Sequence, residues 1–500
     1  MTRLNMTTTN DGPRRNSSSA TQSWGSRISS VAIPFAMVAL VALTGCSLPA
    51  VGPDYRRPEI PAAAAYEHAS GEHLAVVGAR VTSEWWRDFD DAELDRYVAE
   101  ALGENQTLKS AIARVEQARA LTGEARASFL PMIGATDLLS REQTSETTTN
   151  RFPQSLTTTY RLPLTLSWEL DLFGRVRRLN EGAHAGFLAA QELAESTRLT
   201  VAAETASAYF ALVATDEETR IVAATLKLQL EMLSLVEARR EAGRASDLAS
   251  EQAKLAVSIS EADLAAVANR RSALKNGLAV LLGRAAPAFA VDERRQLTGA
   301  LPPIPVGLPG ELLLRRPDLA AAENNLKAAN ARIGVAKAAF FPAISLTGSA
   351  GYASAAIDDL FLRDSRAWSV TPSIYLPLFQ GGRNRANYKR SQAAYEETLA
   401  GYRQNILTAL REVQDALTAS QRLSEQSEAI ARAVASARKV RELAEERYAS
   451  GSTSYLEVID AQRTALAVER NAAALAGQRL ITRVALIRAL GGGWENPSTQ

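Results

Sequence analysis

One cysteine offers the clearest covalent chemistry in this 500-residue chain. Cys46 ends the sequence Leu-Thr-Gly-Cys, in which small residues directly precede the thiol. This pattern is typical of a lipobox, a cleavage site that leaves an acylated cysteine as the new N-terminus. We therefore predict a diacylglycerol and an N-acyl group, such as palmitate, on Cys46, and no other cofactor. Because the cysteine is single, neither an intramolecular disulfide nor a cysteine metal cluster can form.

The residues before Cys46 have the layout of a signal peptide. Four arginines precede the apolar run from Val31 to Leu43, which is shorter than the roughly 20 residues of a membrane-spanning helix. We predict that residues 1–45 are removed, and that Ser47 after the cysteine directs the lipoprotein to the outer membrane. The long basic segment leaves the true start codon open. A buried free thiol behind an uncleaved segment is the alternative.

Enzymatic chemistry has little support in the sequence. The three histidines, His68, His73 and His184, are too scattered for a metal site or an acid/base set. We find no Ser/His/Asp set, no glycine-rich phosphate loop and no metal-ligand spacing. The formal net charge of +1 gives no bulk attraction to nucleic acid. We predict a protein that is not an enzyme, holds no metal and binds no nucleic acid.

The chain repeats four landmarks in the same order at an offset of about 210 residues. Arg126–Pro131 returns as Lys337–Pro342, Leu172–Gly174 as Leu378–Gly381, Ala242–Arg244 as Ser450–Ser452, and Leu281–Gly283 as Ala489–Gly491. We therefore predict two structural repeats, 96–285 and 313–492, joined by an equatorial linker, 286–312, that contains a proline-rich stretch. Residues 46–95 would form the lipidated N-terminal segment and the start of the equatorial region.

Two strand-like segments are expected in each repeat, within about 130–172 and about 342–379. Between Leu156 and Leu172, leucine, tyrosine and tryptophan occupy one parity, and mainly threonine, serine and charged residues occupy the other. Because successive strand side chains point to opposite faces, one face is apolar and the other is wet. This pattern fits a membrane barrel or a soluble sandwich. Aromatic residues near the strand ends and lengths of about 10 to 15 residues favour the barrel.

The weaker partner strands are expected at 131–139 and 342–352, with an external loop from Arg141 to Thr159. Proline cannot donate a ladder hydrogen bond. Bends or strand ends near the periplasmic rim are therefore predicted at three prolines, which are Pro163, Pro372 and Pro377.

The mature sequence contains no apolar stretch as long as a spanning helix, so any crossing of a bilayer must be made by strands. Four strands alone would leave open edges whose backbone groups are unsatisfied in lipid. The chain must therefore associate. A homotrimer would supply twelve strands, an even number within the known range for membrane barrels.

Two proline-free runs, 175–241 and 383–449, are rich in alanine, leucine, glutamate, glutamine and arginine. Each predicts a helix of about 65 residues, or roughly 100 Å. After a tight turn, shorter helices are expected at 247–282 and 454–490, which cover little more than half of that length.

Two further helices would fill the missing half of each rod. We expect Leu312–Ala339 to stack end to end on the first short helix and Ala92–Ala127 to stack on the second. The combined length of each short helix and the helix stacked on its end would then match the length of one long helix.

Apolar or small residues recur in steps of three, four or seven along the first short helix, which predicts a coiled-coil seam whose alanines allow close helix approach. The seam residues are Leu248, Leu255, Ile259, Ala262, Ala266, Ala273 and Val280. A plain soluble helical bundle would explain this seam equally well. It would not explain strand pairs inserted at matching places in both repeats.

Short motifs spread over the mature chain are typical of one family. They are Gly52–Pro58, Leu170–Gly174, Leu314–Leu319 followed by Ala322-Glu323, Phe340–Ile344, and Leu378–Gly382. In these motifs the chain resembles the TolC-like outer-membrane efflux factors, specifically the NodT-family lipoproteins that serve resistance-nodulation-division pumps. The resemblance implies a mixed α and β membrane protein with an internal two-fold repeat. Three copies would form a twelve-stranded β-barrel continuous with a long periplasmic coiled-coil barrel.

The same resemblance implies where the chain docks and with what. The tips of the helical hairpins, at Gly243 and Gly451, would contact a periplasmic adaptor protein, and the glycines would permit the tight turns. The adaptor would connect the channel to an inner-membrane pump, which supplies the energy. Outer-membrane lipid would surround the barrel.

The resemblance also implies a gate near the second tip. Glu457 and Asp460 match carboxylates that line the closed end, where three copies would form a ring that attracts cations. An ordinary solvated helix start is the alternative for these two acids. Tyr448 matches the tyrosine of the gate contact, but Thr453 stands where some members of the family have arginine. That difference puts the gate bond in question.

We expect a passive, gated outer-membrane conduit that exports small toxic compounds, drugs or metal ions, in a tripartite efflux pump. An exit duct for type I protein secretion is the rival within the same class, and a structural coiled-coil lipoprotein is the rival from another class. The sequence does not name the substrate, the adaptor or the pump, because the pump selects what is exported.

Overall fold

The computed structural model describes residues 50–59, 66, 74–75, 82–145, 147, 156–293, 302, 304–305 and 316–493. It divides into two compact units, Met1–Pro49 and Ala50–Gln500, and all described residues belong to the second unit. The predicted signal peptide, Cys46, His68 and His73 lie outside the described residues, as does much of the predicted linker.

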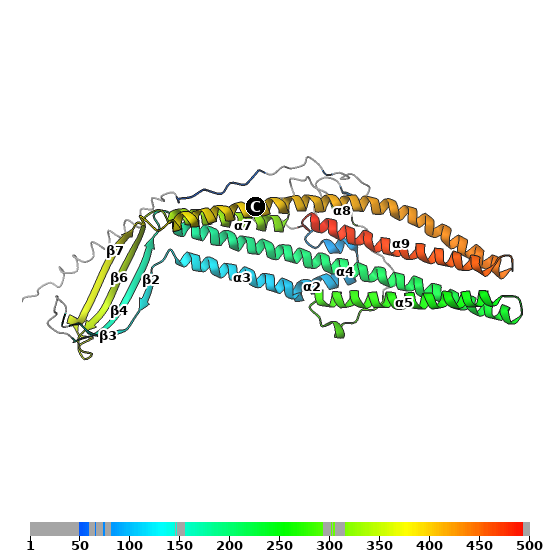
Figure 1. The fold of residues 1–500 in the computed structure, drawn as a ribbon, viewed down its shortest axis with the longest axis horizontal. Coiled ribbons are helices and arrows are strands. Elements are labelled where there is room, and N and C mark those ends of the chain that lie inside the picture. The colour runs from blue at the N-terminus through cyan, green and yellow to red at the C-terminus, as the bar shows by residue number, and fades with distance from the viewer. Residues whose placement is uncertain are drawn as a thin grey trace, which may run out of the picture. The chain divides into compact units, whose positions relative to one another are not determined.

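Two very long helices dominate the described chain (Figure 1). Helix α4 spans Arg175–Glu241 and helix α8 spans Arg383–Ala449, each with 67 residues, so each is about 100 Å long. Helices α5, Asp247–Leu281, and α9, Tyr455–Ala489, have 35 residues each and return along α4 and α8. The result is two helical hairpins, α4–α5 and α8–α9, and each of these four helices ends within one residue of its predicted bounds.

The stacking of the shorter helices differs from the prediction. Helices α2, Ala92–Glu104, and α3, Gln106–Ala127, continue the line of α5, whereas α7, Pro317–Ala338, continues the line of α9 (Figure 1). The predicted assignment was the reverse and is wrong.

Contacts at the helix ends explain this stacking. The Asn105 side-chain amide donates to the Leu281 carbonyl oxygen at 2.8 Å, and it thereby caps the end of α5. The Arg316 guanidinium donates to the Ala489 carbonyl oxygen of α9 at 3.1 Å. Each open helix end is satisfied by a cap on the helix that continues its own line.

One antiparallel sheet extends from the ends of the helices. Its strands are β2 (Met132–Ala135), β3 (Leu138–Gln143), β4 (Leu156–Leu170), β6 (Ala343–Ser354) and β7 (Arg366–Tyr375). Strands β2 and β3 pair with successive parts of β4, so the sheet has four rows in the order β2/β3, β4, β6, β7. Short elements complete the described chain, namely β1 (Leu74–Ala75) paired with β5 (Ile304–Pro305), and the 3-10 helices η1 (Trp85–Phe89), η2 (Ala286–Ala288) and η4 (Arg363–Ser365).

The predicted loop and proline positions need correction. Strand pairing continues to Gln143 opposite Leu156, so both ends of the predicted loop are strand. Pro163 lies inside β4, opposite the break between β2 and β3, where the Thr136 backbone N–H donates to the Pro163 carbonyl oxygen at 3.3 Å. Pro372 lies inside the edge strand β7, where a missing donor is tolerated, and Pro377 follows the strand.

The pairing register gives the sheet one apolar and one polar face. Ser345 and Ser373 pair through their hydroxyls at 2.7 Å, and Ser349 and Ser369 do so at 2.8 Å, so polar side chains form continuous rows. The opposite face carries rows such as Leu164, Ala350 and Trp368. Every residue of the five strands is at least partly exposed, so within the described chain no layer covers either face.

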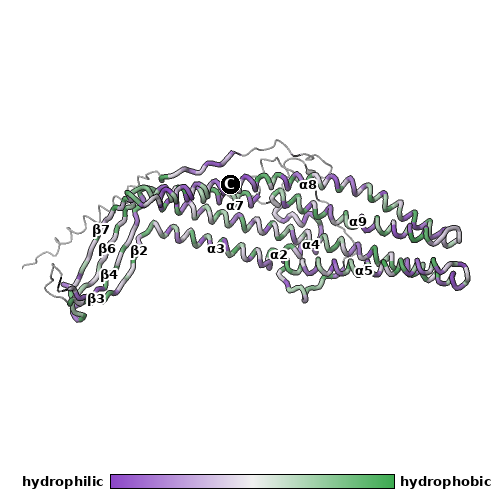
Figure 2. Tube along the Cα trace, viewed as in Figure 1, coloured by the Kyte–Doolittle hydropathy of each residue, from purple (hydrophilic) through white to green (hydrophobic). Residues whose placement is uncertain are grey.

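The largest hydrophobic core lies where α2, α4, α8 and the ends of α5 and α9 meet. Trp85, Phe89, Tyr209 and Phe210 are almost fully buried there, and the Tyr209 hydroxyl donates to the Asp91 carboxylate at 2.9 Å. Outside this core, apolar and polar positions interleave along every long helix (Figure 2). None of the described helices has both the length and the apolar character needed to cross a membrane.

Helix α5 buries a different face from the predicted seam. It packs on α4 through a stripe of mostly small residues that includes Ala253, Val257, Ser260 and Val267. The predicted seam lies on another face and is exposed, with Leu248 at 67% and Val280 at 68%. The seam prediction is therefore wrong within a single chain. Helix α5 has two apolar stripes, and it packs the stripe of small residues on α4 and leaves the predicted seam exposed.

Candidate functional site

The two hairpin turns are built alike. Gly243 has φ +70° and Gly451 has φ +79°, the left-handed region that favours glycine. In each turn the glycine N–H donates to the carbonyl three residues before it, at 2.9 Å to Arg240 and at 3.0 Å to Tyr448. Within the described part of the chain, no heavy atom other than those of the glycine and its two chain neighbours lies within 4 Å of a Cβ built on either glycine. Both tips are therefore tight turns that face open space in the single chain.

Tyr448 takes part in a contact that joins the two hairpin tips. The Arg239 guanidinium of α4 donates to the carbonyl oxygens of Tyr448, at 2.9 Å, and Ala449, at 2.8 Å, at the end of α8. Its central carbon also lies 4.6 Å from the centroid of the Tyr448 ring. A guanidinium at a helix C-terminus stabilises the unpaired carbonyls and the negative end of the helix dipole. The tyrosine thus has an arginine partner from the other hairpin.

Sequence reasoning missed Arg239 because it looked for the arginine at position 453. Thr453 instead has a buried hydroxyl without a hydrogen-bond partner among the described residues. The internal repeat held a usable signal, since Arg239 and Arg447 each lie four residues before a turn glycine. Arg447 contacts Glu457 at 3.8 Å within its own hairpin, whereas Arg239 reaches across to the other.

A small apolar cluster supports the tips from inside. Tyr448 and Tyr455 pack with ring centroids 5.4 Å apart, on a cluster that includes Val236, Ala253 and Val458. Burial, assisted by the nearby Tyr448, raises the pKa of Tyr455 to about 12, so its hydroxyl stays neutral around pH 7. The cluster therefore holds the start of α9 against both α8 and α4.

Glu457 and Asp460 lie on one exposed face in the first two turns of α9. They are three residues apart, a spacing that places side chains on the same side of a helix. The Glu457 side chain is 54% exposed, and Asp460 is exposed with no ion pair or hydrogen bond to another described residue. One chain thus presents two accessible carboxylates beside the tip. Among the described residues there is no group of three or more histidine, cysteine or acidic side chains that could hold a metal ion.

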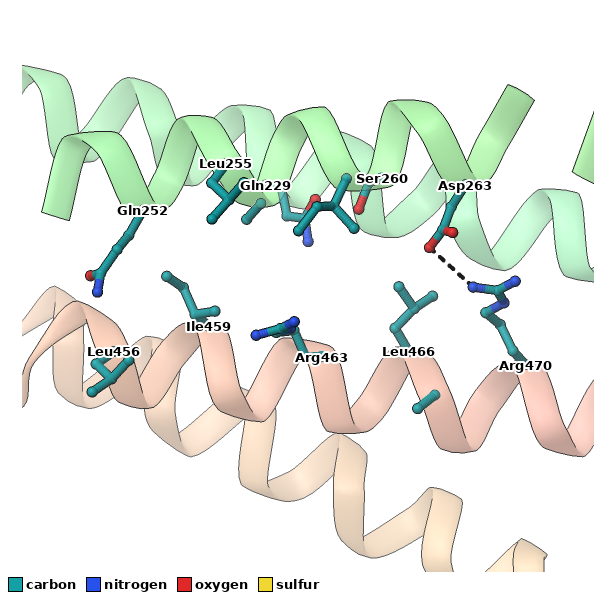
Figure 3. A pocket seen from close by; sticks show the side chains of 13 residues that line it. Gln229, Gln252, Leu255, Ser260, Asp263, Leu456, Ile459, Arg463, Leu466 and Arg470 are labelled. Carbon is teal, nitrogen blue, oxygen red and sulfur yellow. Dashed lines mark hydrogen bonds and ion pairs between the residues drawn. The ribbon is translucent and has the colours of Figure 1, made fainter. Parts of the chain in front are cut away.

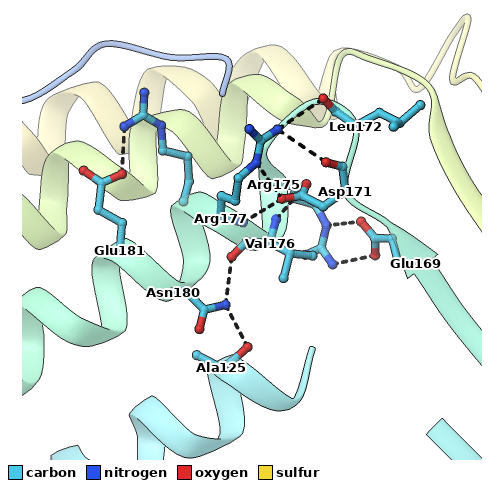
Figure 4. Close-up of polar contacts among 10 residues, drawn as sticks. Ala125, Glu169, Asp171, Leu172, Arg175, Val176, Arg177, Asn180 and Glu181 are labelled. Carbon is cyan, nitrogen blue, oxygen red and sulfur yellow. Dashed lines mark hydrogen bonds and ion pairs between the residues drawn. The ribbon is translucent and has the colours of Figure 1, made fainter. Parts of the chain in front are cut away.

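A second polar site lies where the sheet meets α4 (Figure 4). The Asp171 carboxylate accepts from the backbone N–H groups of Val176, at 3.1 Å, and Arg177, at 2.8 Å, and so caps the helix. Arg175 donates two bonds to Glu169 of β4, at 2.7 and 2.6 Å. The motif from Leu170 to Gly174 therefore fixes the turn from strand to helix.

The N-terminal segment Ala50–Pro58, here called the strap, is fastened over this junction. The Val51 N–H donates to the Phe173 carbonyl oxygen at 3.1 Å, and Asp54 pairs with Arg178 at 2.6 Å. A Cβ built on Gly52 would lie 2.5 Å from the Gly334 Cα of α7, so the two backbones touch.

The end of the strap is held by a carboxylate of α7. The Glu323 side chain accepts from the Arg57 guanidinium and from the Tyr55 hydroxyl. Glu323 belongs to the motif that follows Leu314–Leu319, and Arg57 belongs to the motif Gly52–Pro58. Two motifs that are far apart in the sequence are therefore two halves of one contact.

Comparisons with known proteins agree on one family. A model of the family described as "Outer membrane efflux protein" matches residues 97–284 and 308–492. The outer membrane protein OprJ of Pseudomonas aeruginosa is 37% identical and covers 91% of this chain and 95% of its own length. The probable outer membrane lipoprotein SilC of Salmonella typhimurium is 32% identical, over 90% of this chain and 96% of its own. The solved structure of the outer-membrane channel OprN has a TM-score of 0.83 at 32% identity, over 89% of this chain and 100% of its own.

Proposed function

Because the chain belongs to the outer membrane efflux protein family and serves as an outer-membrane channel component of an efflux pump, we propose that it works as a homotrimer. Each copy would supply one third of the wall, made of four strand rows and the helices below them. Three copies would give twelve strands, an even number that closes without open edges. We further propose that the two halves of the chain are structural repeats of one unit.

The uncovered sheet is the observation that carries this proposal. Among the described residues, its apolar and polar faces are both accessible, and β2/β3 and β7 each have an unpaired edge. In a closed barrel the apolar face would contact lipid outside and the polar face would contact water inside. Pairing of the edge strands of neighbouring copies would satisfy their backbone hydrogen-bonding groups. The exposed apolar stripe of α5, from Leu248 to Val280, would likewise be covered by a neighbouring copy.

The position of the strap supports acylation of Cys46. Val51, five residues after the cysteine, is bonded at the junction between sheet and helix, so an acyl chain on Cys46 starts close in sequence to the base of the proposed barrel. The name of the related SilC describes an outer membrane lipoprotein. We propose that the lipid anchors each copy to the outer membrane.

We propose that the hairpin tips dock onto a periplasmic adaptor, which connects the channel to an inner-membrane pump. Gly243 and Gly451 fit this role because, among the described residues, nothing beyond their chain neighbours lies within 4 Å of a Cβ built on either glycine. The pump would supply the energy, and this chain would supply the gated passage.

We also propose that Glu457 and Asp460 form the selectivity ring of the closed end. Both are accessible, lie on one helix face and come from the tip, so three copies would bring six carboxylates together. The double variant Glu457→Gln with Asp460→Asn should lose block by divalent cations in planar lipid bilayers, because neutral amides no longer attract them.

The matched control is Glu396→Gln with Glu397→Gln, an equal loss of charge on an exposed part of α8 about 80 Å from the tip. Divalent block should be unchanged in this control. Block that persists in the tip variant would refute the ring.

A further inference from the structure

A cluster of four charged side chains ties the two hairpins together far from the tips. Arg470 of α9 donates to Glu218 of α4 at 3.0 Å and to Asp263 of α5 at 3.0 Å. Glu218 also accepts from Arg270 of α5 at 2.8 Å. The cluster is neutral, with two guanidinium and two carboxylate groups. Arg470 is its one member from the second hairpin, so every link between hairpins in this cluster passes through that side chain.

The cluster is partly shielded from water. The Glu218 side chain is 10% exposed, Arg470 is 29% exposed and Asp263 is 33% exposed. Bonds between ionised partners at such depth are stronger than those of surface pairs, because water and salt screen them less. Arg470 lies about 22 Å from the start of α9, at 1.5 Å per residue. The contact therefore lies farther from the hairpin tips than Glu457 and Asp460 do.

Between this cluster and the tips, α5 and α9 stand apart (Figure 3). A groove of about 380 Å³ runs between them, and its walls carry Leu255, Ile259, Ile459 and Leu466. The Asp263–Arg470 ion pair closes one end of the groove (Figure 3). Towards the tips, Arg239 of α4 makes the next described polar link to the second hairpin. From this cluster to the tips, the described polar links between the hairpins thus lie at two levels, and apolar clusters such as the one that includes Val222 of α4 and Leu466 of α9 add to them.

We propose that Arg470 is a latch that limits how far the second hairpin can move away from the first when the channel opens. While the latch holds, only the part of α9 between Arg470 and the hairpin tip, beside the groove, can move. Once it is released, α9 can separate from α4 and α5 over a longer stretch, and the passage widens. Arg470 acts by positioning the helices and does not itself contact what is exported. The inference rests on the proposed trimeric pore.

The test compares purified trimers in planar lipid bilayers. Arg470→Gln should raise the fraction of time spent in the wider state by about tenfold, which corresponds to about 1.4 kcal/mol. Arg470→Lys keeps the charge but reaches one carboxylate at a time, so it should fall between wild type and Arg470→Gln. It also serves as the test variant if Arg470→Gln does not form trimers.

The matched control is Arg438→Gln. Arg438 of α8 pairs at 2.5 Å with Glu469, the residue that precedes Arg470 on α9. The Glu469 side chain is 9% exposed, so this variant also removes the partner of a buried carboxylate on α9. Both partners belong to the second hairpin, and the variant should therefore conduct like wild type.

Equal conductance in wild type and Arg470→Gln would overturn the latch, and so would an equal increase in Arg438→Gln. A wild-type protein that forms no conducting trimers would instead overturn the trimeric pore, and the latch with it.

Discussion

The contact of Arg239 with the end of α8 makes a quantitative prediction about the hairpin tips. Arg239→Gln removes two charge-assisted bonds to carbonyl oxygens and one cation–π contact. Buried bonds to a charged group contribute about 1.5 to 3 kcal/mol each, and an exposed cation–π contact contributes about 0.5 to 1. Arg239 is half-buried and the carbonyls can turn to water, so we expect a loss of about 2 kcal/mol in total.

A loss of about 2 kcal/mol changes an equilibrium by about thirtyfold. The ratio of separated to joined tips should therefore rise by that factor. Spin labels at Arg244→Cys and Ser452→Cys, one on each exposed turn, report the distance between the tips by pulsed electron paramagnetic resonance. In the Arg239→Gln background, a second and longer distance should gain population at the expense of the first.

Arg240→Gln is the matched control for Arg239→Gln. Arg240 is adjacent and pairs with Glu237 and Asp247 of its own hairpin, so its loss should leave the distance distribution unchanged. The reasoning is wrong if Arg239→Gln keeps the wild-type distribution, or if Arg240→Gln broadens it as much.

Two further predictions concern the strap and a buried acid. Gly52 has φ +112°, and Gly52→Ala places a Cβ against the Gly334 backbone, so the strap should detach and trypsin should cut after Arg56. The control is Gly103→Ala, which has open space around its Cβ. Equal resistance to trypsin in wild type and Gly52→Ala would contradict this prediction. Burial, with Glu195 nearby, raises the pKa of Glu192 from 4.5 to about 7. The folded state then binds this proton more tightly than the unfolded chain, so the associated stability is full below about pH 4.5 and is lost as the pH rises through 7. Glu192→Gln should therefore raise the unfolding temperature relative to wild type at pH 8 more than at pH 4, and an equal difference at both pH values would exclude this explanation.

Local signals in the sequence were sufficient for the long helices and for the two faces of the main strands. The long helices end where glycine follows a proline-free run, because the turn at Gly243 or Gly451 needs φ above zero. Strand parity around Trp168 gave the two faces of β4, because side chains alternate whatever lies next to the strand. These features depend on a few neighbouring residues, so a single sequence contains them.

Contacts between elements could not be predicted in the same way. The stacking order was wrong because chain order suggested that α7 follows α5, whereas a side-chain cap at Asn105 decides the pairing. The seam was wrong because α5 carries two apolar stripes, and periodicity does not say which stripe packs first. Arg239 and Arg470 were missed since each is one arginine among many until the fold brings its partners near.

The order of elements across the chain constrains how copies can join. Next to the sheet the helices run α3, α4, α7, α8, and towards the tips they run α5, α4, α9, α8, while the strands run β2/β3, β4, β6, β7. At every level, one edge belongs to the first half of the chain and the other edge to the second half. Identical edges therefore do not need to meet, and the free edge of β7 can pair with β2/β3 of the next copy. Such head-to-tail contacts close into a ring if the rotation per copy fits, so sheet and helices would close together at the same number of copies.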